Sequence, residues 1–111
     1  MFRDLKWSRS EKTVAREAFD NAYKKEISAI VAEVKRRIAK MSDPKDIWRI
    51  HDYLSVQRRQ TDEKYDYRYS VLLLVFTKLI EDKWLTEAEL NGLGEDKLNA
   101  IKTMLSLRSR D

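Results

Sequence analysis

The 111-residue sequence contains no cysteine, one proline, two glycines and one histidine. The absence of cysteine excludes a disulfide framework and thiol chemistry, and it fits a reducing compartment. With so few helix breakers and 38% charged residues, the composition is typical of a soluble helical protein. The sequence therefore predicts an all-α fold without disulfide bonds.

Long hydrophobic runs are missing as well. The longest apolar run, residues 71–76, is far too short to span a bilayer, and the first seven residues lack the apolar core of a signal peptide. The net charge is +4, from 23 Lys and Arg against 19 Asp and Glu, which is too small and too mixed to indicate a nucleic-acid partner. We therefore expect a cytoplasmic protein without a membrane span.

Residues suited to catalysis or metal binding are scarce. The sequence has no Gly-rich phosphate loop, and a metal site would have only carboxylates to place around His51. His51 and Asp52 are sequence neighbours, so on a helix they project about 100° apart and are poorly placed as a catalytic pair. We expect no enzymatic activity, no metal and no cofactor.

The first helix is predicted to begin near Arg9. Ser8 and Glu11 have the spacing of a capping box, in which both side chains satisfy backbone amides at a helix start. An apolar stripe then recurs in steps of three and four residues, without glycine or proline, to a break at residues 42–44. The stripe consists of Phe19, Tyr23, Ile27, Ile30, Val34, Ile38 and Met41.

This helix is too long for a compact domain of this size. About 33 residues would extend about 50 Å, whereas a compact chain of 111 residues is roughly 35 Å across. The helix would overhang its own subunit and leave its stripe uncovered, so we predict a homodimer. The alternative is a break near Ser28 that folds the helix back on itself.

A second helix is predicted to restart after the break and return along the first as a hairpin. Asp43 would be its N-cap, Pro44 its first helical residue, and Asp46 would lie near its positive end. The end of this helix is open, because residues 61–68 are polar but contain neither glycine nor proline. The sequence leaves three alternatives open for these residues: the helix continues, it kinks, or the chain switches to another conformation.

The apolar flank of the second helix carries Ile47, Ile50 and Leu54. We expect these three residues at the dimer interface, with an exposed edge at Ile47 and Ile50. Residues 1–64 would then form the hairpin and dimerisation region, and residues 65–111 a small helical head.

The head is predicted to begin with a buried helix from Arg68 to Lys83. Tyr65, Tyr67 and Tyr69 alternate as in a strand, but such a strand would find no second strand to pair with. The following apolar run has a helical period instead. The expected core of the head consists of Val71, Leu72, Val75, Phe76, Leu79, Trp84, Leu90 and Leu93.

Two further helices complete the predicted head. Thr86 and Glu89 form a second capping box, which opens a short helix that Gly92 ends. A last amphipathic helix turns Leu98, Ile101 and Leu105 inward and leaves a frayed tail over residues 106–111.

The other flank of the second helix combines aromatic and charged residues. A solvated face normally alternates Lys and Glu, so a Trp and the one His beside Arg and Asp suggest a contact surface. The alternative is a buried seam in which these polar groups satisfy one another. The residues are Trp48, His51, Asp52, Ser55, Arg58, Arg59 and Asp62.

A nucleic-acid interface is the rival interpretation, because basic residues lie beside aromatic ones. These are Lys35, Arg36, Arg37, Arg49, Arg58, Arg59 and Arg68. Against it, carboxylates are interleaved with them at Asp46, Asp52, Asp62, Glu63 and Asp66. A mixed surface favours a protein partner with mixed charges of its own.

The sequence contains two long motifs, Trp48-x-x-His51-Asp52-Tyr53-Leu54-Ser55-x-x-Arg58 and Asp62-x-Lys64-Tyr65-Asp66-x-Arg68-x-Ser70-Val71. Together they resemble the fluorescence recovery protein family of cyanobacteria. The likeness runs from Trp7-Ser8 through the segment from Ala18 to Tyr23 and on to Leu98.

The resemblance implies an all-helical homodimer that binds the photoactivated, red form of orange carotenoid protein, chiefly through the C-terminal domain of that protein. Such a protein accelerates the return to the orange form and ends phycobilisome quenching, without a chromophore of its own. Its action would be selective binding along the route between two conformations. The functional patch of the family maps onto Trp48, His51, Asp52 and Arg58, and a second contact region in the head includes Leu74.

Four positions depart from the pattern of the family. Leu74 is found where the family has an aromatic residue, and Ala100 where it can have a Lys. Glu63 is found in place of a small residue, and Lys83 in place of a Gly. The resemblance therefore implies a distant member, whose partner is orange carotenoid protein or a related carotenoid-binding protein. The alternative is a helical dimer that binds another protein or nucleic acid. Arg58 has an alternative role as well: it could be held by Asp62 or Ser55 of the same helix and support the structure instead of binding a partner.

Overall fold

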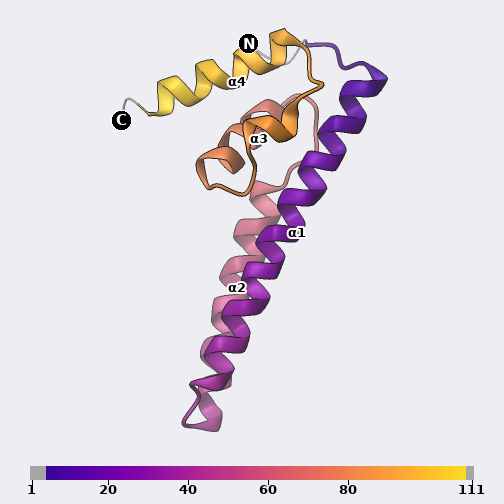
Figure 1. Cartoon of the computed structure of the whole chain (residues 1–111). Coiled ribbons are helices and arrows are strands. Elements are labelled where there is room, and N and C mark those ends of the chain that lie inside the picture. The colour runs from indigo at the N-terminus through magenta and orange to yellow at the C-terminus, as the bar shows by residue number, and fades with distance from the viewer. Residues whose placement is uncertain (1–4, 110–111) are drawn as a thin grey trace.

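The computed structural model describes residues 5–109, and that part of the chain is all-helical. In Figure 1 the first two long helices lie side by side as a hairpin, and the later helices cluster at its open end. This arrangement confirms the predicted all-α fold of a long hairpin with a small C-terminal head. The elements are α1 (Arg9–Ala39), η1 (Pro44–Asp46), α2 (Ile47–Lys64), α3 (Leu72–Glu81), η2 (Glu87–Leu90) and α4 (Glu95–Arg108).

Helix α1 is a single unbroken helix of 31 residues, so the alternative break near Ser28 is wrong. It begins at the predicted capping box: the Ser8 hydroxyl accepts the Glu11 N–H at 3.1 Å, and the Glu11 carboxylate accepts the Ser8 N–H at 2.9 Å. The molecule measures 54 × 33 × 21 Å and its radius of gyration is 17.1 Å. A compact chain of this length has a radius of about 13 Å, so α1 overhangs the head as expected.

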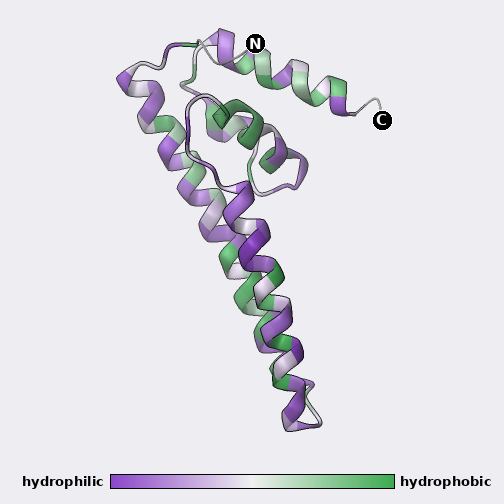
Figure 2. Ribbon diagram, turned by 180° about the vertical axis from the view of Figure 1, so that it is seen from behind, coloured by the Kyte–Doolittle hydropathy of each residue, from purple (hydrophilic) through white to green (hydrophobic). Residues whose placement is uncertain are grey.

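The two halves of α1 have different surroundings. The first half contributes Ala15, Ala18, Phe19 and Ala22 to the core of the head. The second half extends beyond the head alongside α2, and Figure 2 shows hydrophobic segments continuing along this part of the hairpin. Its apolar side chains stay accessible there, for example Val31 and Ile38, which are 47% and 50% exposed.

The connection to α2 follows the predicted restart. Asp43 accepts the Lys45 N–H at 2.8 Å, and Pro44 is the first helical residue, although this first turn is a 3₁₀ helix. Helix α2 then continues past Thr61 and ends at Lys64. Of its 18 residues only Ile50 and Thr61 are buried. None of the helices between residues 5 and 109 has the length and hydrophobicity that a membrane span requires.

The predicted helix from Arg68 to Lys83 is too long, because the chain is extended after α2 and α3 begins only at Leu72. The tyrosines of this extended segment pack on α1. Tyr65 lies edge-on to Phe19 at 5.3 Å between ring centroids, and Tyr67 lies edge-on to Phe19 at 4.8 Å. A helix would turn alternate residues about 200° apart and could not direct both rings at α1.

The core of the head is close to the predicted one. Of the eight expected residues, six are buried, and Val71 and Trp84 pack against the core while partly exposed. The short helix capped by Thr86 forms as the 3₁₀ helix η2. The buried hydrophobic residues of the head outside α1 are Leu72, Leu73, Val75, Phe76, Leu79, Leu85, Leu90, Leu93, Ala100 and Ile101.

Helix α4 turns the predicted residues inward, with Ile101 buried and Leu98 and Leu105 partly buried against the core. The prediction that the chain frays from residue 106 is wrong for residues 106–108, because α4 continues to Arg108. Its guanidinium Nε donates to the Glu81 carboxylate at the end of α3, at 2.5 Å. The remaining tail residues, 110 and 111, lie outside the described residues.

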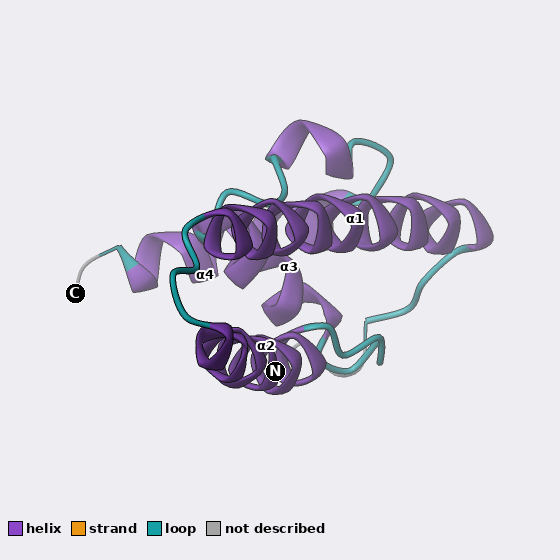
Figure 3. Cartoon of the chain, turned by 90° about the horizontal axis from the view of Figure 1, so that it is seen from below, coloured by secondary structure: helices purple, strands orange, loops and turns teal. Residues whose placement is uncertain are grey.

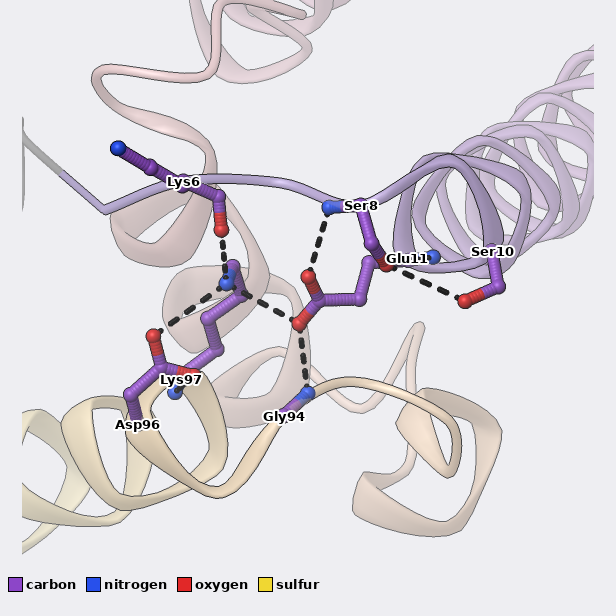
Figure 4. Close-up of polar contacts among 7 residues, drawn as sticks. All are labelled: Lys6, Ser8, Ser10, Glu11, Gly94, Asp96 and Lys97. Atoms are coloured by element: carbon purple, nitrogen blue, oxygen red, sulfur yellow. Dashed lines mark hydrogen bonds and ion pairs between the residues drawn. The ribbon is translucent and has the colours of Figure 1, made fainter.

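A buried ion pair closes the N-terminal segment onto α4 (Figure 4). The Lys97 side chain is almost fully buried; its ammonium donates to the Lys6 carbonyl oxygen at 2.5 Å and lies 3.0 Å from Glu11 Oε2. The Gly94 N–H donates to the same Oε2 at 2.7 Å. Burial alone would raise the pKa of Glu11, but the backbone N–H groups of Ser8 and Gly94, together with Lys97, outweigh it and lower this pKa to about 2.

The C-terminus of α3 closes on a left-handed residue that is not glycine. Lys83 has φ +67°. Its N–H donates to the Ile80 carbonyl, and the next N–H, of Trp84, donates to the Leu79 carbonyl. These two bonds form a Schellman motif, whose left-handed position usually holds glycine because a Cβ is strained there. The sequence resemblance also led us to expect a glycine at this position.

We predict that Glu11 makes stability sensitive to acid. Its pKa falls from an ordinary value of 4.5 to about 2 on folding. The ionised carboxylate therefore stabilises the fold fully above pH 4.5, and this contribution is lost as the pH falls towards 2. Urea titrations of Glu11→Gln should show a flatter pH dependence of the unfolding free energy in this window. Glu17→Gln, at an exposed position of the same helix, is the control; an equal slope in both variants would contradict the assignment.

We predict that Lys83→Gly stabilises the protein by about 0.5–1 kcal/mol, because relief of the left-handed strain exceeds the entropic cost of glycine. Urea unfolding measures the change. Lys78→Gly, at an exposed and right-handed position of α3, should instead destabilise by about 1 kcal/mol. A loss of stability in Lys83→Gly would show that the lysine side chain makes compensating contacts.

Candidate functional site

Helix α2 presents the four residues expected to bind a partner, Trp48, His51, Asp52 and Arg58, which we call the α2 patch. Trp48 is 66% exposed, and its ring lies edge-on to His51 at 6.3 Å between centroids. His51 Nδ1 is 3.5 Å from Asp52 Oδ1, closer than their positions on a helix predicted. Both side chains are exposed, so the pair lacks the buried orienting carboxylate of a catalytic triad.

Arg58 lies further along α2 and forms the intrahelical pair that the sequence left open. Its Nε donates to Asp62 Oδ2 at 3.2 Å. Both side chains are largely exposed, and ion pairs in that setting contribute little to stability. The bond uses one nitrogen of the guanidinium, so the other two stay available for a carboxylate or carbonyl of a partner.

A groove of about 670 Å³ runs between α1 and α2. Its α1 side is apolar and consists of stripe residues, Tyr23, Ile27 and Ile30. Figure 3 shows the two helices from below, with α3 and α4 beyond them. An apolar groove with charged residues along one side suits an amphipathic helix of a partner. The α2 side is lined by His51, Leu54, Ser55, Gln57, Arg58, Thr61 and Asp62.

The structure brings some of the expected site residues together and separates others. His51 and Arg58 of the α2 patch line the groove, whereas Trp48 and Asp52 do not. Leu74, the expected second contact, is exposed on α3 in the head and is not part of the groove. Ala100 is buried in α4, whereas Leu74 is accessible to a partner.

The residues expected at the dimer interface also divide. Leu54 lines the groove, and Ile47 is exposed near the start of α2. Ile50 is only 5% exposed, so the expected exposed edge at this residue is wrong.

A polar cluster that was not expected from the sequence lies at the junction of hairpin and head; we call it the junction cluster, and it consists of Glu26, Lys64, Tyr65 and Asp82. Glu26 is buried, whereas Asp82 is about half exposed. The Glu26 carboxylate accepts the Tyr65 hydroxyl at 2.8 Å and the Lys64 ammonium at 2.7 Å. Lys64 Nζ also lies 3.5 Å from Asp82 Oδ2. Burial and the bond to Glu26 raise the pKa of Tyr65 above its ordinary value.

A signal for Glu26 was present in the sequence. Ala18, Ala22 and Glu26 follow one another in steps of four, so Glu26 continues the face that α1 buries. A carboxylate on such a face requires partners, and a Lys and a Tyr side chain supply them here. Within the described residues 5–109, no group of three or more His, Asp or Glu side chains is placed to hold a metal ion.

Comparison with known proteins gives one consistent result. A family described as photoprotection regulator fluorescence recovery protein matches residues 7–105. The fluorescence recovery protein of Synechocystis sp. (strain ATCC 27184 / PCC 6803 / Kazusa) is 35% identical over 101 residues, which cover 91% of this chain and 93% of that protein. The solved structure of the Fremyella diplosiphon fluorescence recovery protein matches with a TM-score of 0.83 and 46% identity, over 91% of this chain and 98% of that one. The solved structure of the fluorescence recovery protein from Synechocystis sp PCC 6803 also matches with a TM-score of 0.83. It is 34% identical, and the match covers 89% of this chain and 97% of that one.

We predict that Arg58 contributes little to stability. Because its pair with Asp62 is exposed, Arg58→Ala should lower the unfolding free energy by less than about 1 kcal/mol. Phe76 is fully buried in the head, and Phe76→Ala should cost about 3–5 kcal/mol. Urea unfolding compares the two variants. Equal losses would place Arg58 in a buried seam rather than on a surface.

Proposed function

The chain belongs to the family of the photoprotection regulator fluorescence recovery protein, and we propose that it accelerates the return of photoactivated orange carotenoid protein, or of a related carotenoid-binding protein, from the red to the orange form. In this proposal it acts in the cytoplasm, binds the C-terminal domain of its partner and ends phycobilisome quenching. It does so by binding alone, without covalent chemistry or a cofactor. The observation that carries the proposal is the α2 patch, which is exposed and lies within the matched residues 7–105.

The chemistry of the α2 patch supports recognition of a protein surface. Trp48 offers a large rigid face, Arg58 a planar fork of donors, and Asp52 an anionic acceptor. A partner surface that is accessible only while two domains are apart would be bound most tightly in that open arrangement or on the route to closure. Tighter binding along the route than in the red form lowers the barrier to recovery.

The groove and the overhanging half of α1 support a homodimer as the working form. Tyr23, Ile27 and Ile30 form an apolar wall, and Leu54 faces them from α2. Apolar surface that continues along a helix and faces solvent marks an interaction site. In a two-fold symmetric dimer, the hairpin of each copy covers the same surface of the other copy. No equivalent surface is then left to bind a third copy.

We predict that Ile47→Glu separates the dimer. The variant should keep its helix content, because Ile47 is exposed on its own chain, but its mass in light scattering should halve. Gln60→Glu adds a carboxylate at another exposed position of α2, outside the groove, and should leave the mass unchanged. Wild-type protein that is already monomeric at micromolar concentrations would refute the dimer.

We predict that the protein speeds the dark relaxation of photoactivated orange carotenoid protein, measured as the red-to-orange absorbance change. Arg58→Lys should already weaken this effect, since lysine keeps the charge but loses the fork, while thermal stability and dimer mass stay unchanged. Higher salt should also slow the accelerated relaxation, because the patch is exposed.

The neighbouring exposed arginine provides the matched control, Arg59→Lys, which should behave as wild type. If the wild-type protein leaves the relaxation rate unchanged, the proposed function fails. If Arg58→Glu accelerates relaxation as well as wild type, Arg58 has no part in the mechanism.

A further inference from the structure

Helix α2 is fixed to the rest of the chain at few points. Its N-terminal end follows the short connection from α1, and Ile50 is buried near that end. Along its middle, the Arg37 guanidinium stacks over the Tyr53 ring at 4.0 Å, and the open groove occupies the next part of the seam. The distance between the C-terminal half of α2 and α1 therefore depends on non-covalent contacts near Lys64.

The junction cluster supplies those contacts. Glu26 is 7% exposed, and its two carboxylate oxygens accept different partners, Oε1 the Tyr65 hydroxyl and Oε2 the Lys64 ammonium. Lys64 extends the connection to Asp82 at the end of α3. One carboxylate thereby links α1, the last residue of α2 and the head. The two bonds to Glu26 are largely shielded from water, unlike the exposed Arg58–Asp62 pair, so they hold their partners more firmly.

The junction cluster borders one end of the groove, because Tyr65 contacts two residues that line it. Tyr23 lies one turn before Glu26 and lines the groove, and its ring meets Tyr65 edge-on at 5.1 Å. Thr61 lines the groove as well, and its carbonyl accepts the Tyr65 N–H at 3.0 Å. Movement of Lys64 away from Glu26 would therefore change the width of the groove at this end.

We propose that Glu26 is a positioning residue for the groove: through Lys64 and Tyr65 it holds the C-terminal half of α2 at the distance from α1 that a second copy of this chain requires. The inference rests on the proposed function, in which a second hairpin covers the apolar α1 wall of the groove, and the α2 patch opposite that wall meets the carotenoid partner. Glu26 itself is buried and contacts neither.

Hydrogen exchange read by mass spectrometry tests this role in Glu26→Ala. Backbone amides of residues 57–68 should exchange roughly 10- to 100-fold faster, the factor expected when the partners of a shielded charge are lost. Amides of α3 should keep their wild-type rates. The variant should also dissociate, in light scattering, at a concentration where the wild type is dimeric, and should accelerate carotenoid-protein relaxation less.

Two further variants separate positioning from general support. Glu26→Gln keeps an acceptor for Tyr65 but not the charge that faces Lys64, so it should restore part of the protection and of the dimer. Glu33→Gln is the matched control, because Glu33 is another carboxylate of α1 whose partners, Arg36 and Arg37, lie on α1 itself. It should leave the exchange of residues 57–68 unchanged, because the contact of Arg37 with α2, over the Tyr53 ring, lies outside that segment.

Faster exchange in α3 as well as in residues 57–68 would overturn the inference, because Glu26 would then support the whole fold. Wild-type exchange in residues 57–68 would overturn it too, as would faster local exchange with unchanged dimer mass and recovery. Exchange and mass require no carotenoid protein. A failure of the proposed function in the relaxation assay is therefore distinguishable from a failure of this inference.

Discussion

The length of α1 is the constraint on which the rest of the molecule depends. Its first half presents Ala15, Ala18 and Ala22 to the head, and these small side chains let the core close on the helix. Its second half extends past the head with α2 alone beside it, and α2 buries only two of its 18 residues. The groove and the α2 patch both lie on this overhang. Stability is thus concentrated at the head, and the surface suited to recognition lies beyond it.

Burial separates the structural ion pairs from those that face solvent. Lys97 and Glu11 form an ion pair that is shielded from water where α1 meets the start of α4. Removing one partner of such a pair typically lowers the unfolding free energy by about 3–5 kcal/mol. Arg58 and Asp62 have similar chemistry but lie in water, where a pair contributes about 0–1 kcal/mol. A charged residue of the second kind can exchange its neighbour for a partner protein at little cost. The buried pair therefore serves the fold, and the exposed one is suited to binding.

The features that the sequence predicted are mostly local. Ser8, Asp43 and Thr86 cap their elements as expected, because capping depends on residues within one turn. The tyrosine segment after α2 was misjudged because its conformation is decided by rings of α1 that are distant in sequence. The same holds for Ile50 and Glu26, whose burial depends on which faces of the two helices meet. The exposed α2 patch followed from its residue types and from the family resemblance, whereas the groove became visible only in three dimensions.

The central claim is that a second copy of the chain covers the apolar stripe of α1. Thermal unfolding of the wild-type protein, measured over a roughly 100-fold range of protein concentration, tests it most directly. If the overhanging stripe is buried between two chains, dissociation accompanies unfolding and mass action favours the folded dimer at high concentration. The midpoint of unfolding should then rise steadily with concentration. A midpoint that stays constant across the range would contradict this arrangement.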